Sequence, residues 1–228
     1  MTLGRRNVIF HIDVNSAFLS WEAVYRLHHL GGKEDLREKV SAVGGDMAMR
    51  HGIILAKSIP AKKFHIKTGE TILEAKQKCP ELILVPPNYG LYEKCSKAFM
   101  DILRRYSPTV EQYSIDEAFV DMTGTEGLWG DPVTAAYRMK DQIRDTLGFT
   151  VNIGISENKL LAKMASDFQK PDRVHTLWHN EIEDKMWPLP VQELLFCRKI
   201  HRGQPEASGN PHHWRPGEDG SRSFSNII

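Results

Sequence analysis

Two adjacent acidic residues, Asp116 and Glu117, interrupt a run of strand-forming residues and constrain how the chain can fold around them. β-branched and aromatic residues stand on both sides, with Val110 and Tyr113 before the pair and Phe119 after it. In a regular strand the two acids would point to opposite faces, because side chains alternate with a period of two. If the chain reverses near this pair, both carboxylates can face one point. Carboxylates at close range repel each other, so such a site needs a cation.

A third acidic residue, Asp13, stands near the end of another predicted strand. The residues from Val8 to Val14 alternate as in a strand that buries one face more than the other. Asn15 or Ser16 can cap the helix that follows. A carboxylate at a strand end, followed at once by free helical N–H groups, suits a metal ion together with a phosphate.

Together, Asp13, Asp116 and Glu117 would supply three carboxylates from two strands. An isolated Asp-Glu pair is more commonly a solvated hairpin tip, and the distant Asp13 is what favours a shared site. Hard divalent cations such as Mg²⁺ prefer oxygen ligands and fill the rest of their coordination shell with water and substrate phosphates. The sequence therefore predicts a magnesium site between the two strands.

Three motifs, in this order and spacing, resemble those of the Y-family translesion DNA polymerases, the low-fidelity enzymes of lesion bypass. The motifs are Asp13-Val14-Asn15-Ser16-Ala17-Phe18, Ser114-Ile115-Asp116-Glu117-Ala118, and the segment from Gly154 through Lys159 and Lys163 to Lys170-Pro171. Each motif alone is weak, whereas the combination is specific and covers roughly residues 7 to 196.

The resemblance implies template-directed DNA synthesis in DNA repair and damage tolerance. Two Mg²⁺ ions would be held by Asp13, Asp116, Glu117 and the carbonyl group of Val14. The implied substrates are primer-template DNA and a deoxynucleoside triphosphate.

The same resemblance assigns nucleotide contacts. Phe18, with Ala17 beside it, would be the steric gate that excludes a 2′-hydroxyl group, although core packing is the commoner role of a phenylalanine. Lys170 would contact the β- and γ-phosphates, and Lys62 would contact the triphosphate. The chain departs from the family at Lys62, where arginine is common, and at Ile59, where tyrosine is common.

Two further lysines, Lys159 and Lys163, lie one helical turn apart and are explained equally well as surface residues or as functional ones.

The fold class expected from these patterns is α+β, a polymerase palm whose antiparallel or mixed sheet is backed by helices on one face. Apolar periodicity predicts helices over residues 17–30, 88–106 and 131–147. A further helix is predicted after Asn158, with Leu160 among its inward-facing residues and Lys170-Pro171 at its end.

The family pattern also suggests subdomains. Residues 1–21 and 81–175 would form the palm, residues 22–80 a small fingers subdomain, and residues 176–196 the start of a helical thumb.

The composition excludes few functions. The apolar fraction of 41% suffices for a buried core, and the net charge of +1 does not by itself indicate nucleic-acid binding, so DNA contacts would come from local patches. Three cysteines without metal-binding spacing indicate reduced thiols in the cytoplasm. The sequence shows no signal peptide and no apolar run long enough to span a bilayer.

Beyond Phe196 the sequence changes character. Residues 197–228 are rich in Arg, His, Pro, Gly and Ser, a composition typical of disorder. One back-translation from Cys197, read one nucleotide later, gives Val-Gly-Lys-Ser-Thr-Glu-Ala, which resembles the next turn of the family pattern. The hypothesis is a frameshift near codon 197. The little-finger domain that grips duplex DNA, and a sliding-clamp contact through the C-terminal region, would then be absent.

Two alternative functions fit the same residues. A fragment without the little-finger domain would bind Mg²⁺ and nucleotide but extend a primer poorly, because phosphate contacts dominate nucleic-acid affinity. A palm-fold nucleotidyl cyclase would use similar acids without a template.

Overall fold

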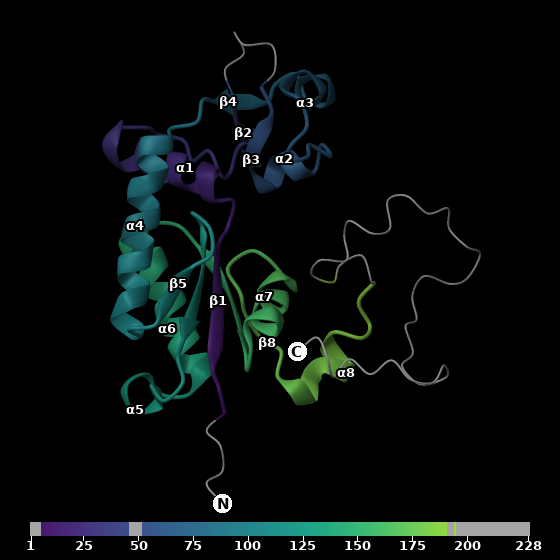
Figure 1. Ribbon diagram of the computed structural model, residues 1–228. Helices are drawn as coiled ribbons and strands as arrows, with labels where there is room; N and C mark the ends of the chain where they lie inside the picture. Colours follow the sequence, from purple (N-terminus) through teal and green to yellow (C-terminus); the bar gives the residue numbers. More distant parts are fainter. Residues whose placement is uncertain (1–5, 46–51, 191–193, 195–228) are drawn as a thin grey trace, which may run out of the picture.

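The chain forms two β-sheets joined through one helix, as the computed structural model shows (Figure 1). The structure describes residues 6–45, 52–190 and 194, so the hypotheses about residues 197–228 lie outside it. The larger sheet carries the acidic motifs, and the smaller sheet lies beyond its end, at the top of the view.

The larger sheet has five strands in the order β5-β6-β1-β7-β8. The strands are β1 (Ile9–Val14), β5 (Val110–Gln112), β6 (Glu117–Asp121), β7 (Val151–Ser156) and β8 (Val174–Thr176). Neighbouring strands are antiparallel except β7 and β8, which are parallel, so the sheet is mixed as predicted. The short strand β8 was not expected from the sequence.

Two long helices, α4 (Tyr89–Tyr106) and α6 (Pro132–Leu147), pack on one face of this sheet. Asn88 caps α4 and Asp131 caps α6 with side-chain hydrogen bonds, and Gly148 ends α6 in the left-handed region at a φ of 75°. The main core lies between these layers and includes Phe10, Ile12, Phe99, Leu103, Ala136, Met139, Ile153 and Ile155.

Helix α7 (Lys159–Asp167) covers the opposite face, so the expectation of helices on one face is incomplete (Figure 1). Gly154 permits this packing, because a Cβ atom there would collide with the backbone of Ala162 and Ser166. The prediction that Leu160 faces inward is wrong. It is 37% exposed, since Leu161 on the next position takes the buried side. The helix also ends at Asp167, before Lys170.

The smaller sheet has the strand order β3-β2-β4, with β2 antiparallel to β3 and parallel to β4. Its strands are β2 (Ser41–Gly44), β3 (Ile54–Lys57) and β4 (Ile83–Val85), and its helices are α2 (Ile59–Lys62) and α3 (Ile72–Lys78). Its core consists of Ala42, Ile54, Ala61, Ile66, Ile72, Ala75, Cys79 and Leu82.

Helix α1 (Ala17–His29) joins the two sheets. Trp21 packs in the main core, whereas Leu19 and Ala23 pack against Val43 and Val85 of the smaller sheet. The amphipathic helix predicted over residues 17–30 is therefore buried on two sides.

The remaining elements are α5 (Glu126–Trp129), the 3₁₀ turn η2 (His179–Glu181) and α8 (Ile182–Lys185). Leu177, Ile182 and Met186 pack against α7 in a separate small core. Across the residues that the structure describes, no helix has the length and apolarity needed to cross a membrane.

Candidate active site

The pairing of β1 with β6 places Asp13 directly opposite Glu117. Directly opposed residues of an antiparallel pair share one face of the sheet, so both carboxylates lie on the face that α7 covers. The backbone N–H group of Val14 donates to the carbonyl group of Asp116 at 3.0 Å, which extends the pairing into the turn.

The chain reverses at the acidic pair, as the sequence predicted. The N–H groups of Tyr113 and Ser114 donate to the carbonyl group of Glu117 at 3.0 and 3.1 Å and close the turn. Asp116 therefore lies in the turn, and Glu117 is the first residue of β6. The Oδ1 atom of Asp116 accepts a hydrogen bond from the Ser114 hydroxyl group at 2.7 Å.

Two donors hold the Glu117 carboxylate. Its Oε2 atom accepts from Nε2 of His11 at 3.1 Å and forms an ion pair with the ammonium group of Lys163. Burial alone would raise the pKa of Glu117, but the hydrogen bonds from His11 and Lys163 outweigh burial and lower the pKa to about 2. Glu117 is therefore an ionised carboxylate with a fixed orientation.

Asp13 is held by Lys170. The ammonium group of Lys170 pairs with Oδ2 of Asp13 and also with Oδ1 of Asp167 at 2.9 Å. Burial raises the pKa of Asp13; Lys170 opposes this shift, while the nearby carboxylates of Glu117 and Asp116 add to it. The net direction is upward, so the protein's own cations leave negative charge at this position incompletely compensated.

A divalent cation fits the chemistry of this group of side chains. Carboxylate oxygens from two neighbouring strands are the ligands that Mg²⁺ prefers, and the pairing of β1 with β6 brings Asp13 and Glu117 to one face of the sheet. Within the described ranges, no three His, Cys, Asp or Glu side chains are already arranged to hold a metal. Lysines occupy oxygens of Asp13 and Glu117, and a serine occupies one of Asp116. The assignment of Asp13, Val14, Asp116 and Glu117 as ligands stays a prediction.

Two residues separate β1 from helix α1, so Ala17 and Phe18 follow Asp13 closely along the chain. The expected capping of this helix by Asn15 or Ser16 is wrong. Ser16 occupies the cap position, but at a φ of 47° its side chain makes no capping hydrogen bond. Asn15 instead uses its side chain for the segment around Asp172. The first-turn N–H groups of an α-helix have no acceptor within the helix.

Phe18 is half-buried and stacks on Tyr92. The two ring centroids lie 4.5 Å apart with an angle of 8° between the rings. The Tyr92 hydroxyl group donates to the buried Glu22 carboxylate at 3.1 Å, which fixes the supporting ring. Ala17 is buried beside Phe18.

Sequence reasoning missed two residues of the site, His11 and Ser166, and did not assign Lys163 to it. His11 is fully buried, and its Nδ1 atom lies 2.8 Å from the Ser166 hydroxyl oxygen, so the ring bridges α7 and Glu117. A signal was present for His11, because a residue two positions before Asp13 in a strand shares its face. Lys163 was left open between two roles; its contact with Glu117 requires α7 to cross the sheet.

The other predicted lysines lie apart from the carboxylates. Lys62 is exposed on α2 and makes none of the bonds that hold Asp13, Asp116 and Glu117. Lys159 is exposed and pairs with Glu111 on β5.

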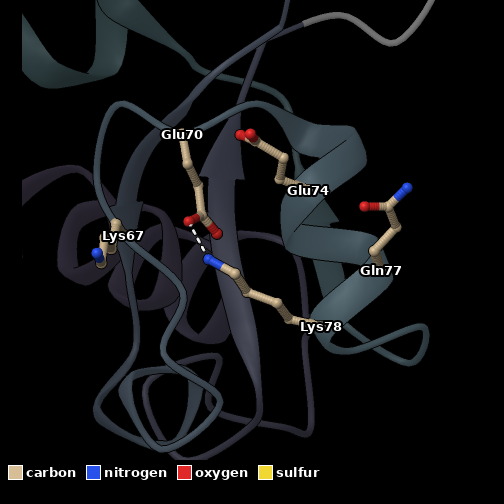
Figure 2. A pocket seen from close by; sticks show the side chains of 5 residues that line it. All are labelled: Lys67, Glu70, Glu74, Gln77 and Lys78. Carbon is tan, nitrogen blue, oxygen red and sulfur yellow. Dashed lines mark hydrogen bonds and ion pairs between the residues drawn. The ribbon is translucent and has the colours of Figure 1, made fainter.

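A surface pocket of about 450 Å³ lies on the smaller sheet unit, lined by Lys67, Glu70, Glu74, Gln77 and Lys78 (Figure 2). Three of its charged groups, Glu70, Glu74 and Lys78, are engaged with one another or with neighbouring residues. Lys78 pairs with Glu70, and Glu74 forms the capping box of α3 with Thr71. None of its residues belongs to the elements that carry the acidic motifs, so it is not part of the site.

Comparison with known proteins identifies the family of the chain. The sequence model of the impB/mucB/samB family matches residues 12–167, and the chain belongs to this family. The matched range contains both acidic motifs and all of α7.

Relatives and solved structures agree with this class. A protein of Clostridium acetobutylicum named DNA polymerase IV is 52% identical over 193 residues, covering 84% of this chain and 48% of that protein. DNA polymerase IV 1 of Bacillus subtilis is 39% identical, covering 84% of this chain and 44% of its own length. The chain thus spans about half the length of the curated relatives that it matches.

Among solved structures, DinB from Sulfolobus solfataricus is similar with a TM-score of 0.72 and 26% identity, covering 82% of this chain and 53% of that one. The insertion ternary complex of Dbh DNA polymerase has a TM-score of 0.72 and 27% identity, covering 83% and 54%. A chimera titled as a Y-family DNA polymerase has a TM-score of 0.71 at 27% identity, covering 82% and 53%. The motif-based resemblance and the α+β fold class are therefore confirmed, and polymerases of this family are generally metal-dependent.

Proposed function

We propose that this chain is the catalytic palm and fingers of a template-directed DNA polymerase of the translesion type. The observation that carries the proposal is the cross-strand placement of Asp13 opposite Glu117, with Lys170 and Lys163 on their carboxylates. The relatives named DNA polymerase IV support the choice of reaction. The role in lesion bypass and DNA repair is supported only by the family to which these relatives belong.

Asp13, Asp116, Glu117 and the Val14 carbonyl group would bind two Mg²⁺ ions. The metal pair supplies electrostatic stabilisation of the attacking and leaving oxygens in nucleotidyl transfer. In this proposal His11 and Lys163 orient Glu117, and Ser114 orients Asp116. The protein's part is to fix carboxylates before substrate arrives, which minimises reorganisation during the reaction.

Lys170 and the start of α1 would receive the triphosphate. Lys170 pairs with Asp13 in the absence of nucleotide, and its ammonium group can turn to a phosphate oxygen. The N–H groups of the first turn of α1, at Ala17 and Phe18, add the anion-binding end of a helix. Lys62 would add a more distant, solvent-exposed positive charge.

Phe18 would lie against the sugar of the nucleotide and exclude a 2′-hydroxyl group. Support comes from its half-burial and from Tyr92, whose ring prevents Phe18 from moving inward. A pinned aromatic ring discriminates by shape because it cannot yield to one additional oxygen atom.

The subdomain boundaries, the substrates and the partners are also proposals. Residues 1–21 and 81–175 would be the palm, residues 22–80 the fingers, and residues 176–196 the start of the thumb. Primer-template DNA and a deoxynucleoside triphosphate would be the substrates in the cytoplasm, and a sliding clamp would be a further partner. The ternary-complex structure of Dbh DNA polymerase supports the pairing of DNA and nucleotide for a related chain.

The proposal is tested by template-dependent primer extension together with nucleotide binding in the presence of Mg²⁺. Replacing Lys170 by alanine should raise the KM for nucleotide about tenfold or more, the value of a charge-assisted hydrogen bond. Lys185→Ala is the matched control, because Lys185 is a half-exposed lysine paired with Glu181 away from the acidic motifs. Template-independent product, or equal kinetics for Lys170→Ala and the wild type, would contradict the proposal. A cyclic nucleotide product would indicate a cyclase.

A further inference from the structure

Lys170 lies in an irregular segment, residues 168–173, between the end of α7 and the start of β8. Lysine has a long side chain with high rotational freedom, so its position depends on how well its backbone is held. Three elements outside this segment hold it, through Asn152, Asn15 and Lys140.

Asn152 on β7 is fully buried and makes hydrogen bonds with both ends of the segment. Its Nδ2 atom donates to the carbonyl groups of Ser166 at 3.0 Å and Gln169 at 2.6 Å. Its Oδ1 atom accepts from the N–H group of Arg173 at 3.3 Å. One side chain therefore binds the backbone just before and just after Lys170-Pro171-Asp172.

Asn15, directly after β1, continues this network. Its Nδ2 atom donates to Oδ1 of Asn152 at 3.1 Å. Its Oδ1 atom accepts from the N–H group of Asp172 at 2.9 Å and from the Thr150 hydroxyl group at 3.0 Å. Asn15 is only two residues from Asp13, so the partner of Lys170 and the anchor of its segment lie on the same short stretch of backbone.

Lys140 on α6 holds the segment from a third direction. Its side chain is 6% exposed, and its ammonium group pairs with Oδ1 of Asp172 at 2.8 Å and with Asp141 at 3.3 Å. A buried ammonium group is strongly stabilised by a paired carboxylate, so the pair restrains Asp172 firmly. The side chain of Asp172 is thus fixed two residues after Lys170.

We propose that Lys140, with Asn15 and Asn152, acts as a positioning residue that fixes Lys170 at the Asp13 carboxylate for contact with the triphosphate. The proposal rests on the proposed function for the role of Lys170, but the positioning itself is a property of the chain without nucleotide. Lys140 touches no reacting group in this proposal and acts through Lys170. Lys140 lies on α6, outside the three family motifs, so sequence reasoning did not single it out.

The test compares Lys140→Met with Arg144→Met. Methionine keeps most of the length of the lysine and removes its charge. Arg144 lies one turn further along α6 and pairs with Asp141 and Asp145 at 2.7 and 2.9 Å, without contact to Asp172. Asp172→Asn is a second variant that is expected to fold, because the Asp172 side chain is 34% exposed and its backbone N–H bond to Asn15 remains.

The first measurement is the acylation rate of the Lys170 amine by a water-soluble succinimidyl ester, read by peptide mass spectrometry without nucleotide. We expect Lys140→Met and Asp172→Asn to increase this rate about threefold to tenfold over the wild type, and Arg144→Met to leave it unchanged. Equal Lys170 acylation in all four proteins would overturn the positioning proposal, whether or not the chain binds nucleotide.

The second measurement is the dissociation constant of a deoxynucleoside triphosphate in the presence of Mg²⁺. We expect Lys140→Met to weaken binding about threefold to tenfold in a background with Lys170 and to have no further effect in Lys170→Ala. Additive losses in the double variant would mean that Lys140 acts independently of Lys170 and would overturn the proposal. A wild-type chain that binds no nucleotide would refute the proposed function, while the acylation result would still decide the positioning.

Discussion

The two sheets of this protein differ in the length of their strands and in the size of the side chains in their cores. The larger sheet places β1 in the centre, and its core contains large side chains such as Phe10, Phe99 and Met139. The smaller sheet has strands of three or four residues and a core of Ile, Leu, Cys and Ala side chains, three of them the small residues Ala42, Ala61 and Ala75.

The charged residues follow the same division. On the larger sheet Asp13, Glu117 and Lys170 are held in specific bonds; burial raises the pKa of Asp13, whereas hydrogen bonds from His11 and Lys163 outweigh burial and lower the pKa of Glu117. On the smaller sheet Lys62 and Lys63 stand exposed on or beside α2. The comparison teaches that chemistry requiring fixed geometry is located where burial can enforce it, whereas charges that act at longer range tolerate a solvated surface.

The largest effect should come from Asp116→Ala on the larger sheet. Loss of one carboxylate from the proposed metal site should lower the primer-extension rate about a thousandfold or more. Because the Asp116 side chain accepts its hydrogen bond from Ser114 within its own turn, the melting temperature should change little. Asp101→Ala, at an exposed acid on α4, is the control and should retain activity. Primer extension by Asp116→Ala at the wild-type rate would show that the held carboxylates of the larger sheet are not needed for the reaction, and would contradict the comparison.

The next effect concerns stability and compares the two cores directly. Phe99→Ala in the larger core should lower the free energy of unfolding by about 3–5 kcal/mol, and Ile54→Ala in the smaller core by about 2–4 kcal/mol. Both side chains are fully buried, so the difference reports side-chain size and local packing. Urea denaturation followed by circular dichroism measures both values. A larger loss for Ile54→Ala would show that the smaller sheet is the better-packed unit.

A smaller effect is expected at Phe18, where α1 connects the two sheets. Phe18→Ala should raise incorporation of ribonucleotides relative to deoxynucleotides by about tenfold to a hundredfold, because the ring no longer fills the position of the 2′-hydroxyl group. Single-nucleotide incorporation with each sugar gives the ratio. Tyr92→Phe keeps the stacked ring and should preserve selectivity. Unchanged sugar selectivity in Phe18→Ala would make Phe18 a packing residue only.

The smallest effect should come from Lys62→Ala on the smaller sheet. A single exposed charge is screened by solvent and salt, so the KM for nucleotide should rise about twofold to threefold and the effect should fade at higher ionic strength. The neighbouring Lys63→Ala serves as the matched variant. A rise in the KM for nucleotide as large as that of Lys170→Ala would contradict this expectation. It would show that α2 closes onto the nucleotide.

Local sequence was a good guide where the signal was local. Alternating apolar residues marked β1, and apolar periodicity marked α4 from residue 88 and α6 from residue 131. The failures were of two kinds. Strand β8 has three residues and exists through pairing with β7, so its own residues carry little signal. Leu160 was assigned inward from its apolar character, although the direction that α7 presents to the sheet depends on packing at Gly154.

By itself, the sequence determined which groups are available: three carboxylates near two strand ends, an aromatic ring five residues after the first of them, and a lysine before a proline. The family motifs then determined the class, which the comparisons confirm. Only the tertiary structure decided which groups meet. The register of β1 against β6 sets Asp13 opposite Glu117, and the passage of α7 across the sheet brings Lys163 and Ser166 to Glu117 and His11. These contacts join residues 46 to 155 positions apart along the chain, and the free energy of such contacts comes from burial and pairing across elements, which no local pattern of residues contains.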